Sequence, residues 1–124
     1  MVYECKICKY EPKSHSFDNL GKVNGINYLY TCPAKAIKYY DHDGILEHYN
    51  GLLNDLNGER WCWIFDARGF SLKHYLEVRT AIDLAKLISN FYGNSLITIY
   101  IYKPSWHLKL TLNMVWGFLS QHMR

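Results

Sequence analysis

Two cysteines near the start of the chain have a spacing that could support metal or redox chemistry. Cys5 and Cys8 form a C-x-x-C pair, which occurs in zinc sites and in redox dithiols. Zinc needs four ligands, and only His15 and Cys32 are expected to complete the set, at a spacing that matches no common zinc module. A redox dithiol would lie at a strand-to-helix junction, whereas this pair precedes the first predicted strand. The two cysteines are therefore weak candidates, and no metal or cofactor is expected.

A second group has the residue types of a nucleophilic triad. It consists of Cys62, Asp66 and His74. Cys62 lies inside the apolar run Trp61 to Phe65, where a cysteine usually behaves as a small buried hydrophobe. The sequence also contains no glycine-rich phosphate loop of either common pattern. These observations predict a protein that is not an enzyme.

The composition is that of one globular domain. The chain has 124 residues, of which 49% are hydrophobic and 20% are charged. Its net charge of +3 suits an anionic membrane surface but is too small for a nucleic-acid-binding protein. No run approaches the roughly 18 apolar residues of a membrane span, and charges interrupt the region where a signal peptide would have its apolar core. We expect a cytoplasmic, peripherally membrane-associated protein with reduced cysteines.

The hydrophobic pattern alternates between strands and helices. This β-α-β-α-β-α order predicts an α/β fold with a small, largely parallel twisted sheet and covering helices. Residues 1–24 show no clear period and are interpreted as a lead-in segment, and residues 25–124 are interpreted as the domain. The predicted strands span 26–32, 61–66 and 95–102, and the predicted helices span 33–58 (divided at Gly44), 71–93 and 105–123.

The strand 61–66 ends abruptly in a polar turn. Asp66 follows the apolar run, Gly69 permits a sharp turn and Ser71 can cap the next helix. In open α/β sheets, ligands usually bind beyond the carboxyl ends of the strands. The turn therefore either borders a site or is an ordinary connection between a strand and a helix.

The apolar run 95–102 is expected to form a buried strand.

The last predicted helix is apolar on almost every side. Such a helix is either buried or in contact with lipid. Lys103, His107 and Lys109 lie at its entrance, and this combination of bases and tryptophans fits a membrane-interface or lipid-covering element. The alternative is a core helix that packs against a protein partner.

The order of these motifs resembles the CRAL-TRIO lipid-binding domain. The resemblance rests on "RWCWIFDARGFS", a long helix, "NFYGNSLITIYIYKPSW" and an apolar helix that contains "WGFL", and it covers roughly residues 21–122. The matching positions are Tyr92, Pro104, Trp106, Phe118 and Leu119. The resemblance implies a non-catalytic domain in which the sheet is the floor of an apolar cavity and the last helix is a mobile gate. It also implies that the helix 71–93 covers the outer face of the sheet.

Three departures from the family pattern affect this reading. The helical N-terminal region common in the family is not found. The acidic-basic pair that helps hold inositol phosphate is replaced by Asn94 and Ser95. The strand that follows the gate in the family is also missing, so the chain is interpreted as a minimal, C-terminally shortened member.

From this resemblance we predict binding or transfer of phosphatidylinositol or a phosphoinositide, at a transient membrane contact. The candidates for the headgroup are Lys103, His107, Lys109, Arg68 and Lys73. The candidates for the acyl cavity and gate are Trp63, Phe65, Ile99, Ile101, Trp106, Leu108, Leu112, Val115, Trp116 and Leu119. The alternative is a protein-interaction module, for example one that binds a small GTPase. An unpaired sheet edge and the apolar last helix also predict a homodimer.

Overall fold

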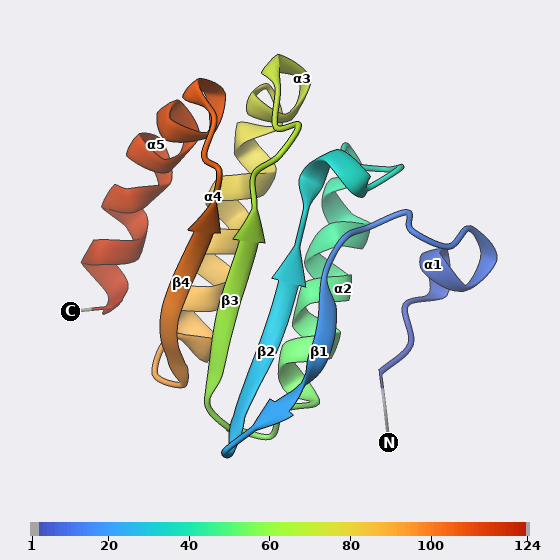
Figure 1. Cartoon of the computed structure of the whole chain (residues 1–124), viewed down its shortest axis with the longest axis vertical. Coiled ribbons are helices and arrows are strands. Elements are labelled where there is room, and N and C mark those ends of the chain that lie inside the picture. Colours follow the sequence, from blue (N-terminus) through green and yellow to red (C-terminus); the bar gives the residue numbers. More distant parts are fainter. Residues whose placement is uncertain (1–2, 124) are drawn as a thin grey trace.

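A four-stranded sheet forms the centre of the fold, in the order β1-β2-β3-β4 (Figure 1). The computed structural model describes residues 3–123, and their side chains as far as residue 115. β2, β3 and β4 are parallel, and β1 is antiparallel to β2. The predicted α/β class with a mostly parallel sheet is confirmed. The strands are β1 (Asp18–Val23), β2 (Ile26–Thr31), β3 (Trp61–Asp66) and β4 (Leu96–Tyr102).

β1 is an element that the hydrophobic pattern does not predict. All six of its residues are exposed, so the segment has no buried face to produce an alternating pattern. Asn24 and Gly25 connect β1 to β2 with φ values of 53° and 80°. An Asn-Gly pair with positive φ at both positions is typical of a two-residue hairpin. This dipeptide was the available signal, and through it part of the lead-in segment joins the sheet.

The first predicted helical region contains two separate elements. A 3-10 turn, η1 (Pro33–Lys35), follows β2, and α2 (His42–Asn54) follows a loop. The predicted division at Gly44 is wrong, because Gly44 lies in the first turn of α2 and its N–H donates to the N-cap carboxylate of Asp41 at 3.2 Å.

The second predicted helix is interrupted in the structure. α3 (Leu72–Tyr75) is a single turn after Ser71, α4 (Val78–Leu87) is the main helix, and η2 (Ile88–Tyr92) is a π-helical turn. A short helix near the start of the chain, α1 (Lys6–Tyr10), and the C-terminal helix, α5 (Trp106–Met123), complete the fold.

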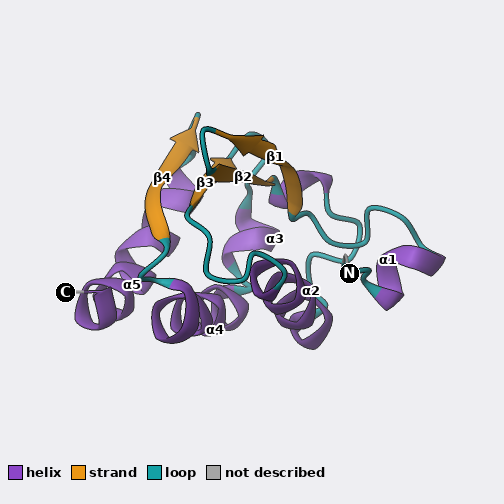
Figure 2. Ribbon diagram, turned by 90° about the horizontal axis from the view of Figure 1, so that it is seen from below, coloured by secondary structure: helices purple, strands orange, loops and turns teal. Residues whose placement is uncertain are grey.

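The helices α2, α4 and α5 lie side by side on one face of the sheet (Figure 2). The main core fills the space between α2 and the strands, where Phe17, Leu53 and Trp61 are almost completely buried. The expectation that the helix 71–93 covers the outer face is wrong, because α4 shares the inner face with α5. The prediction of a buried β4 is also wrong. β4 is an edge strand, and Tyr100 and Tyr102 are about half exposed on its outer face.

Candidate functional site

A cavity of about 960 Å³ lies between the inner face of the sheet and the helices. Its volume falls within the roughly 300–1,000 Å³ range of small-molecule pockets. Most of its wall is apolar, and the lining residues come mainly from the strands β2 to β4, the helices α2, α4 and α5, and the loop that contains η1. The cavity is therefore the leading candidate for a binding site.

The floor of the cavity is built by the parallel register of β3 and β4. Trp63 is paired with Ile99, and Phe65 is paired with Ile101. Because side chains alternate between the faces of a strand, these four point to the same side of the sheet. All four line the cavity.

The opposite wall combines small residues on α4 with larger apolar residues on α5. Thr80, Ala81 and Ala85 face the cavity from α4. On α5 the helical spacing brings the remaining apolar lining residues onto one face. These are Leu108, Leu112 and Val115. The small side chains of α4 leave space that neither the strands nor α5 fill.

Polar atoms in the wall largely bond to one another. The indole N–H of Trp63 donates to the hydroxyl oxygen of Thr31 at 3.0 Å, and that hydroxyl contacts the hydroxyl of Tyr49 at 2.9 Å. Their pairing leaves the neighbouring surface apolar, which favours a hydrocarbon over a polar ligand.

His74 is the exception among the polar groups of the wall. Its Nδ1 accepts the backbone N–H of Ser71 at 3.0 Å, so the proton of the neutral ring lies on Nε2. Nε2 is buried and makes no hydrogen bond of normal geometry within the described part of the chain, although the backbone of Pro33 lies near enough to favour a protonated ring. Burial, followed by the positive charge of Lys73, lowers the pKa of His74 and favours this neutral form. The cavity wall therefore offers one N–H donor, on a residue that the sequence suggested only as part of a triad.

Cys62, Asp66 and His74 have the residue types of a nucleophilic triad but do not form one in the structure. The carboxylate of Asp66 is bonded to Tyr30 and Arg68, and Nδ1 of His74 is occupied by Ser71. Cys62 is buried within β3. The arrangement therefore provides no activated nucleophile among these three residues.

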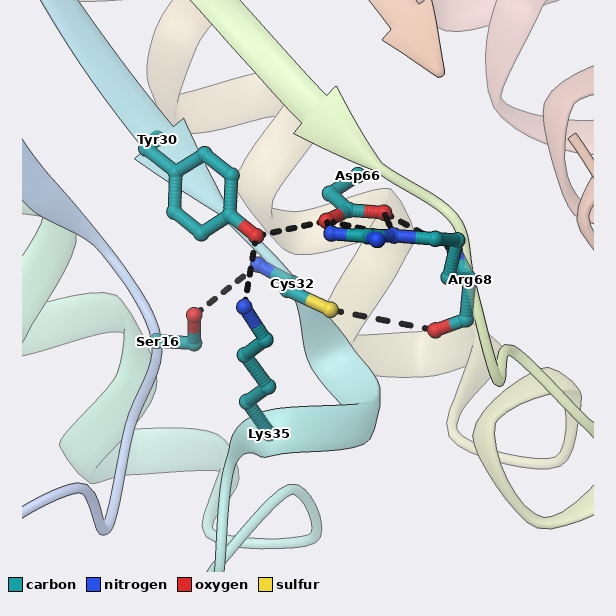
Figure 3. Close-up of polar contacts among 6 residues, drawn as sticks. All are labelled: Ser16, Tyr30, Cys32, Lys35, Asp66 and Arg68. Atoms are coloured by element: carbon teal, nitrogen blue, oxygen red, sulfur yellow. Dashed lines mark hydrogen bonds and ion pairs between the residues drawn. The ribbon is translucent and has the colours of Figure 1, made fainter. Parts of the chain in front are cut away.

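A polar cluster marks the carboxyl ends of β2 and β3 (Figure 3). Asp66 is 2% exposed and accepts hydrogen bonds from the guanidinium of Arg68 at 2.7–3.1 Å and from the hydroxyl of Tyr30 at 2.6 Å. The ammonium of Lys35 donates to the same hydroxyl at 3.1 Å. The hydrogen bonds from Arg68 are the main reason that the pKa of Asp66 lies well below its usual range. The turn after β3 is thus fixed by an ionised carboxylate.

Cations gather on tyrosine rings at this end of the sheet. Arg68 and Lys103 both lie over Tyr102, at 5.1 and 5.7 Å from the ring centre, and Lys35 lies over Tyr30 at 5.3 Å. We call Lys35, Arg68 and Lys103 the basic rim. Because Asp66 neutralises one of the three positive charges, the rim and this carboxylate together carry a net charge of +2.

The residues that the sequence suggested for the headgroup do not all lie together in the structure. Arg68 and Lys103 meet in the basic rim, which also includes Lys35, a residue that sequence reasoning missed. Lys73 lies apart, over the ring of Tyr39. His107 and Lys109 are on the first turn of α5. None of the five predicted residues lines the cavity.

Of the residues that the sequence suggested for the cavity and gate, some line the cavity and others do not. The floor and α5 residues named above line the cavity, whereas Trp106 is 69% exposed and does not. Trp116 and Leu119 lie outside the residues whose side chains are described. Further lining residues that the sequence did not single out include Tyr39, Phe70 and Thr111. Their positions depend on how the loops and helices pack, which local periodicity does not encode.

The cluster around Asp66 gives a test of stability. We expect Asp66→Asn to lower the free energy of unfolding by about 2 kcal/mol at neutral pH, because it removes a buried charge that Arg68 and Tyr30 solvate. Since folding depresses the carboxyl pKa, this contribution is present above the unfolded-state value of about 4 and is lost as pH falls below it. Urea unfolding at pH 7 and pH 3 measures the effect.

The control for this experiment is Asp18→Asn, at an exposed position in β1. We expect it to change the unfolding free energy by no more than about 0.5 kcal/mol. Equal effects of the two substitutions at pH 7, or a difference that does not shrink at acid pH, would contradict the role assigned to the ionised Asp66.

The comparisons with known proteins agree with the fold. Residues 8–124 match the model of the CRAL/TRIO domain. The searches of curated proteins and of solved structures gave no match. Within the described residues, no helix is long and apolar enough to cross a membrane. CRAL/TRIO domains are usually non-catalytic modules that bind or transfer lipids. Since the match covers nearly the whole sequence, the chain belongs to the CRAL/TRIO domain family.

Proposed function

We propose that the protein binds and transfers a phosphoinositide or phosphatidylinositol, with an acyl chain in the cavity and α5 as a gate. The observation that carries this proposal is the apolar cavity of about 960 Å³ between the sheet and α5. Burial contributes about 0.8 kcal/mol per methylene, so ten buried carbons would contribute about 8 kcal/mol. The unpartnered N–H of His74 could donate to an ester oxygen of the same ligand.

The contacts at the start of α5 support a gate that turns about its first residues. The hydroxyl of Ser105 donates to the carbonyl of Phe70 at 3.0 Å and accepts the N–H of Leu108 at 3.2 Å. These bonds hold the amino end of the helix to the turn after β3. Farther along, α5 contacts α4 through apolar side chains such as Leu112 and Val115. Apolar contacts are not directional, so they can separate and reform as a ligand passes.

The charges near the carboxyl ends of the strands support an anionic headgroup. Lys103 belongs to the basic rim, and His107 and Lys109 follow it in the first turn of α5. An acyl chain in the cavity would leave its phosphate close to the sheet edge where ligands usually bind in α/β folds. The same charges would favour transient contact with an anionic membrane surface.

A cavity-filling substitution tests acyl binding. We expect Ala81→Phe to reduce phosphatidylinositol transfer between vesicles by tenfold or more, because the added ring occupies space that the acyl chain needs. The control is Met114→Phe, since Met114 is 39% exposed on α5 and does not line the cavity. Circular dichroism verifies that both variants fold. Equal transfer by the two folded variants would argue against an acyl chain in this cavity.

Charge reversal tests the headgroup. We expect the double substitution Lys103→Glu and Lys109→Glu to reduce binding to phosphoinositide vesicles by tenfold or more, because it replaces two attractive charges by two repulsive ones. Arg60→Glu is the control, since Arg60 is exposed and directly precedes the opposite end of β3. If neither substitution affected binding, the charges would not be recognition elements. A protein recovered in place of any lipid would favour the alternative, an interaction module.

Self-association is a separate proposal. Within residues 3–123, no strand pairs with the outer edge of β4, and Ile97 on this strand is 45% exposed. Exposed edges readily pair with another chain. We expect light scattering on delipidated, detergent-free protein to give twice the 14.7 kDa mass of the chain. A monomer that remains soluble at every concentration would contradict the homodimer.

A further inference from the structure

Four potential metal ligands from distant parts of the sequence meet beside α2. They are Cys5, Cys8, His15 and His48, and their ligand atoms all lie within 4.8 Å of one another. The exposed fractions of Cys5, His15 and His48 are 8%, 3% and 6%, and Cys8 is partly buried. Cys32, which the sequence suggested as a ligand, instead approaches the backbone carbonyl of Arg68.

The distances within this group match the edges of a zinc tetrahedron. Zinc–sulfur bonds of about 2.3 Å and zinc–nitrogen bonds of about 2.0–2.1 Å place sulfur and nitrogen about 3.6 Å apart. Nδ1 of His15 lies 3.6 Å from Sγ of Cys5 and 3.7 Å from Sγ of Cys8. Nδ1 of His48 lies 3.7 Å from Sγ of Cys8.

The other nitrogen of each imidazole is held by an acceptor. Nε2 of His15 donates to the carboxylate of Asp41 at 2.8 Å, and Nε2 of His48 donates to the carbonyl of Phe17 at 2.7 Å. In a neutral ring this arrangement leaves Nδ1 without a proton, so its lone pair is available to a metal. Histidine ligands of zinc usually have such an acceptor behind them.

We propose that Cys5, Cys8, His15 and His48 form a structural Zn²⁺ site. Two thiolates and two neutral imidazoles are the ligand set of closed structural zinc sites. The two thiolate charges balance the charge of the ion, so the complex is neutral and suited to a mostly buried position. The site is separate from the apolar cavity, because none of the four ligands lines it.

Zinc at this position would hold the N-terminal segment on the domain. Cys5 is the N-cap of α1 and Cys8 lies on its first turn, while His48 belongs to α2. α1 lies at the margin of the molecule beside α2 (Figures 1 and 2). No residue of the short helix is fully buried, and Ile7 and Tyr3 make only local contacts with α2, so a metal bridge would strengthen this attachment.

Metal analysis of the wild-type protein tests the site directly. The full chain is produced in zinc-supplemented medium and purified with a reducing agent but without a chelator. We expect one Zn²⁺ per chain by inductively coupled plasma mass spectrometry. After replacement of zinc by Co²⁺, we expect thiolate-to-cobalt charge transfer and the visible absorption of a tetrahedral ion. Zinc far below one per chain together with no cobalt spectrum, or a disulfide between Cys5 and Cys8, would overturn the proposal.

Matched substitutions test which residues hold the ion. We expect Cys8→Ala and His48→Asn to lose the bound zinc or to bind it at least 100-fold more weakly in chelator competition. Cys62→Ala, at a buried cysteine in β3, and His42→Asn, at a histidine on the same helix, should retain one zinc. Zinc retained equally by all four variants would overturn the site. If a ligand variant fails to fold, the wild-type cobalt spectrum still decides.

The carboxylate behind His15 gives a finer test. Asp41→Asn keeps an oxygen at the N-cap of α2 but removes the negative charge beside the His15 ring. We expect apparent zinc affinity to fall about tenfold, as is typical when an outer acceptor of a zinc-bound histidine is lost. Unchanged affinity would contradict the assignment of His15 as a ligand.

Discussion

The spacing between the sheet and its single layer of helices is the constraint on which the site depends. Near α2, large side chains such as Phe17 and Trp61 fill this space, whereas Ala81 and Ala85 on α4 do not. The cavity of about 960 Å³ is partly open to solvent, so an apolar ligand that displaced water from its wall would gain hydrophobic free energy. Because most of this wall is apolar, it is best matched by an apolar ligand.

The charged cluster complements this apolar wall because it lies outside the cavity. Asp66 fixes the turn after β3 through Arg68, and Arg68 in turn shares the ring of Tyr102 with Lys103. This separation of apolar surface from positive charge is the arrangement that the proposed anionic lipid would need. In the D-x-x-G turn that begins at Asp66, the carboxylate thus organises the neighbouring cations.

The sequence predicted those parts of the fold that local pattern determines. The apolar run of β3, the α5 helix after Pro104 and the α/β order were read correctly. β1 was not predicted because its residues are exposed on both faces of the strand. The helix α4 was expected on the wrong face of the sheet, because periodicity identifies the buried side of a helix but not the element that covers it. His48 was missed as a metal ligand because 32 residues separate it from His15, and only the fold brings the segment after α1 against α2.

The N-terminal segment connects the zinc ligands to the wall of the cavity. Phe17 accepts the hydrogen bond of His48 through its carbonyl, while its ring stacks on Tyr49 at 3.9 Å between ring centres. Tyr49 lines the cavity, and so does Ser16, which directly precedes Phe17 in the chain. A zinc ion that fixed His48 would thus also fix one side of the cavity wall, opposite the proposed gate α5. One rigid wall and one movable wall would allow ligand exchange without loss of the sheet.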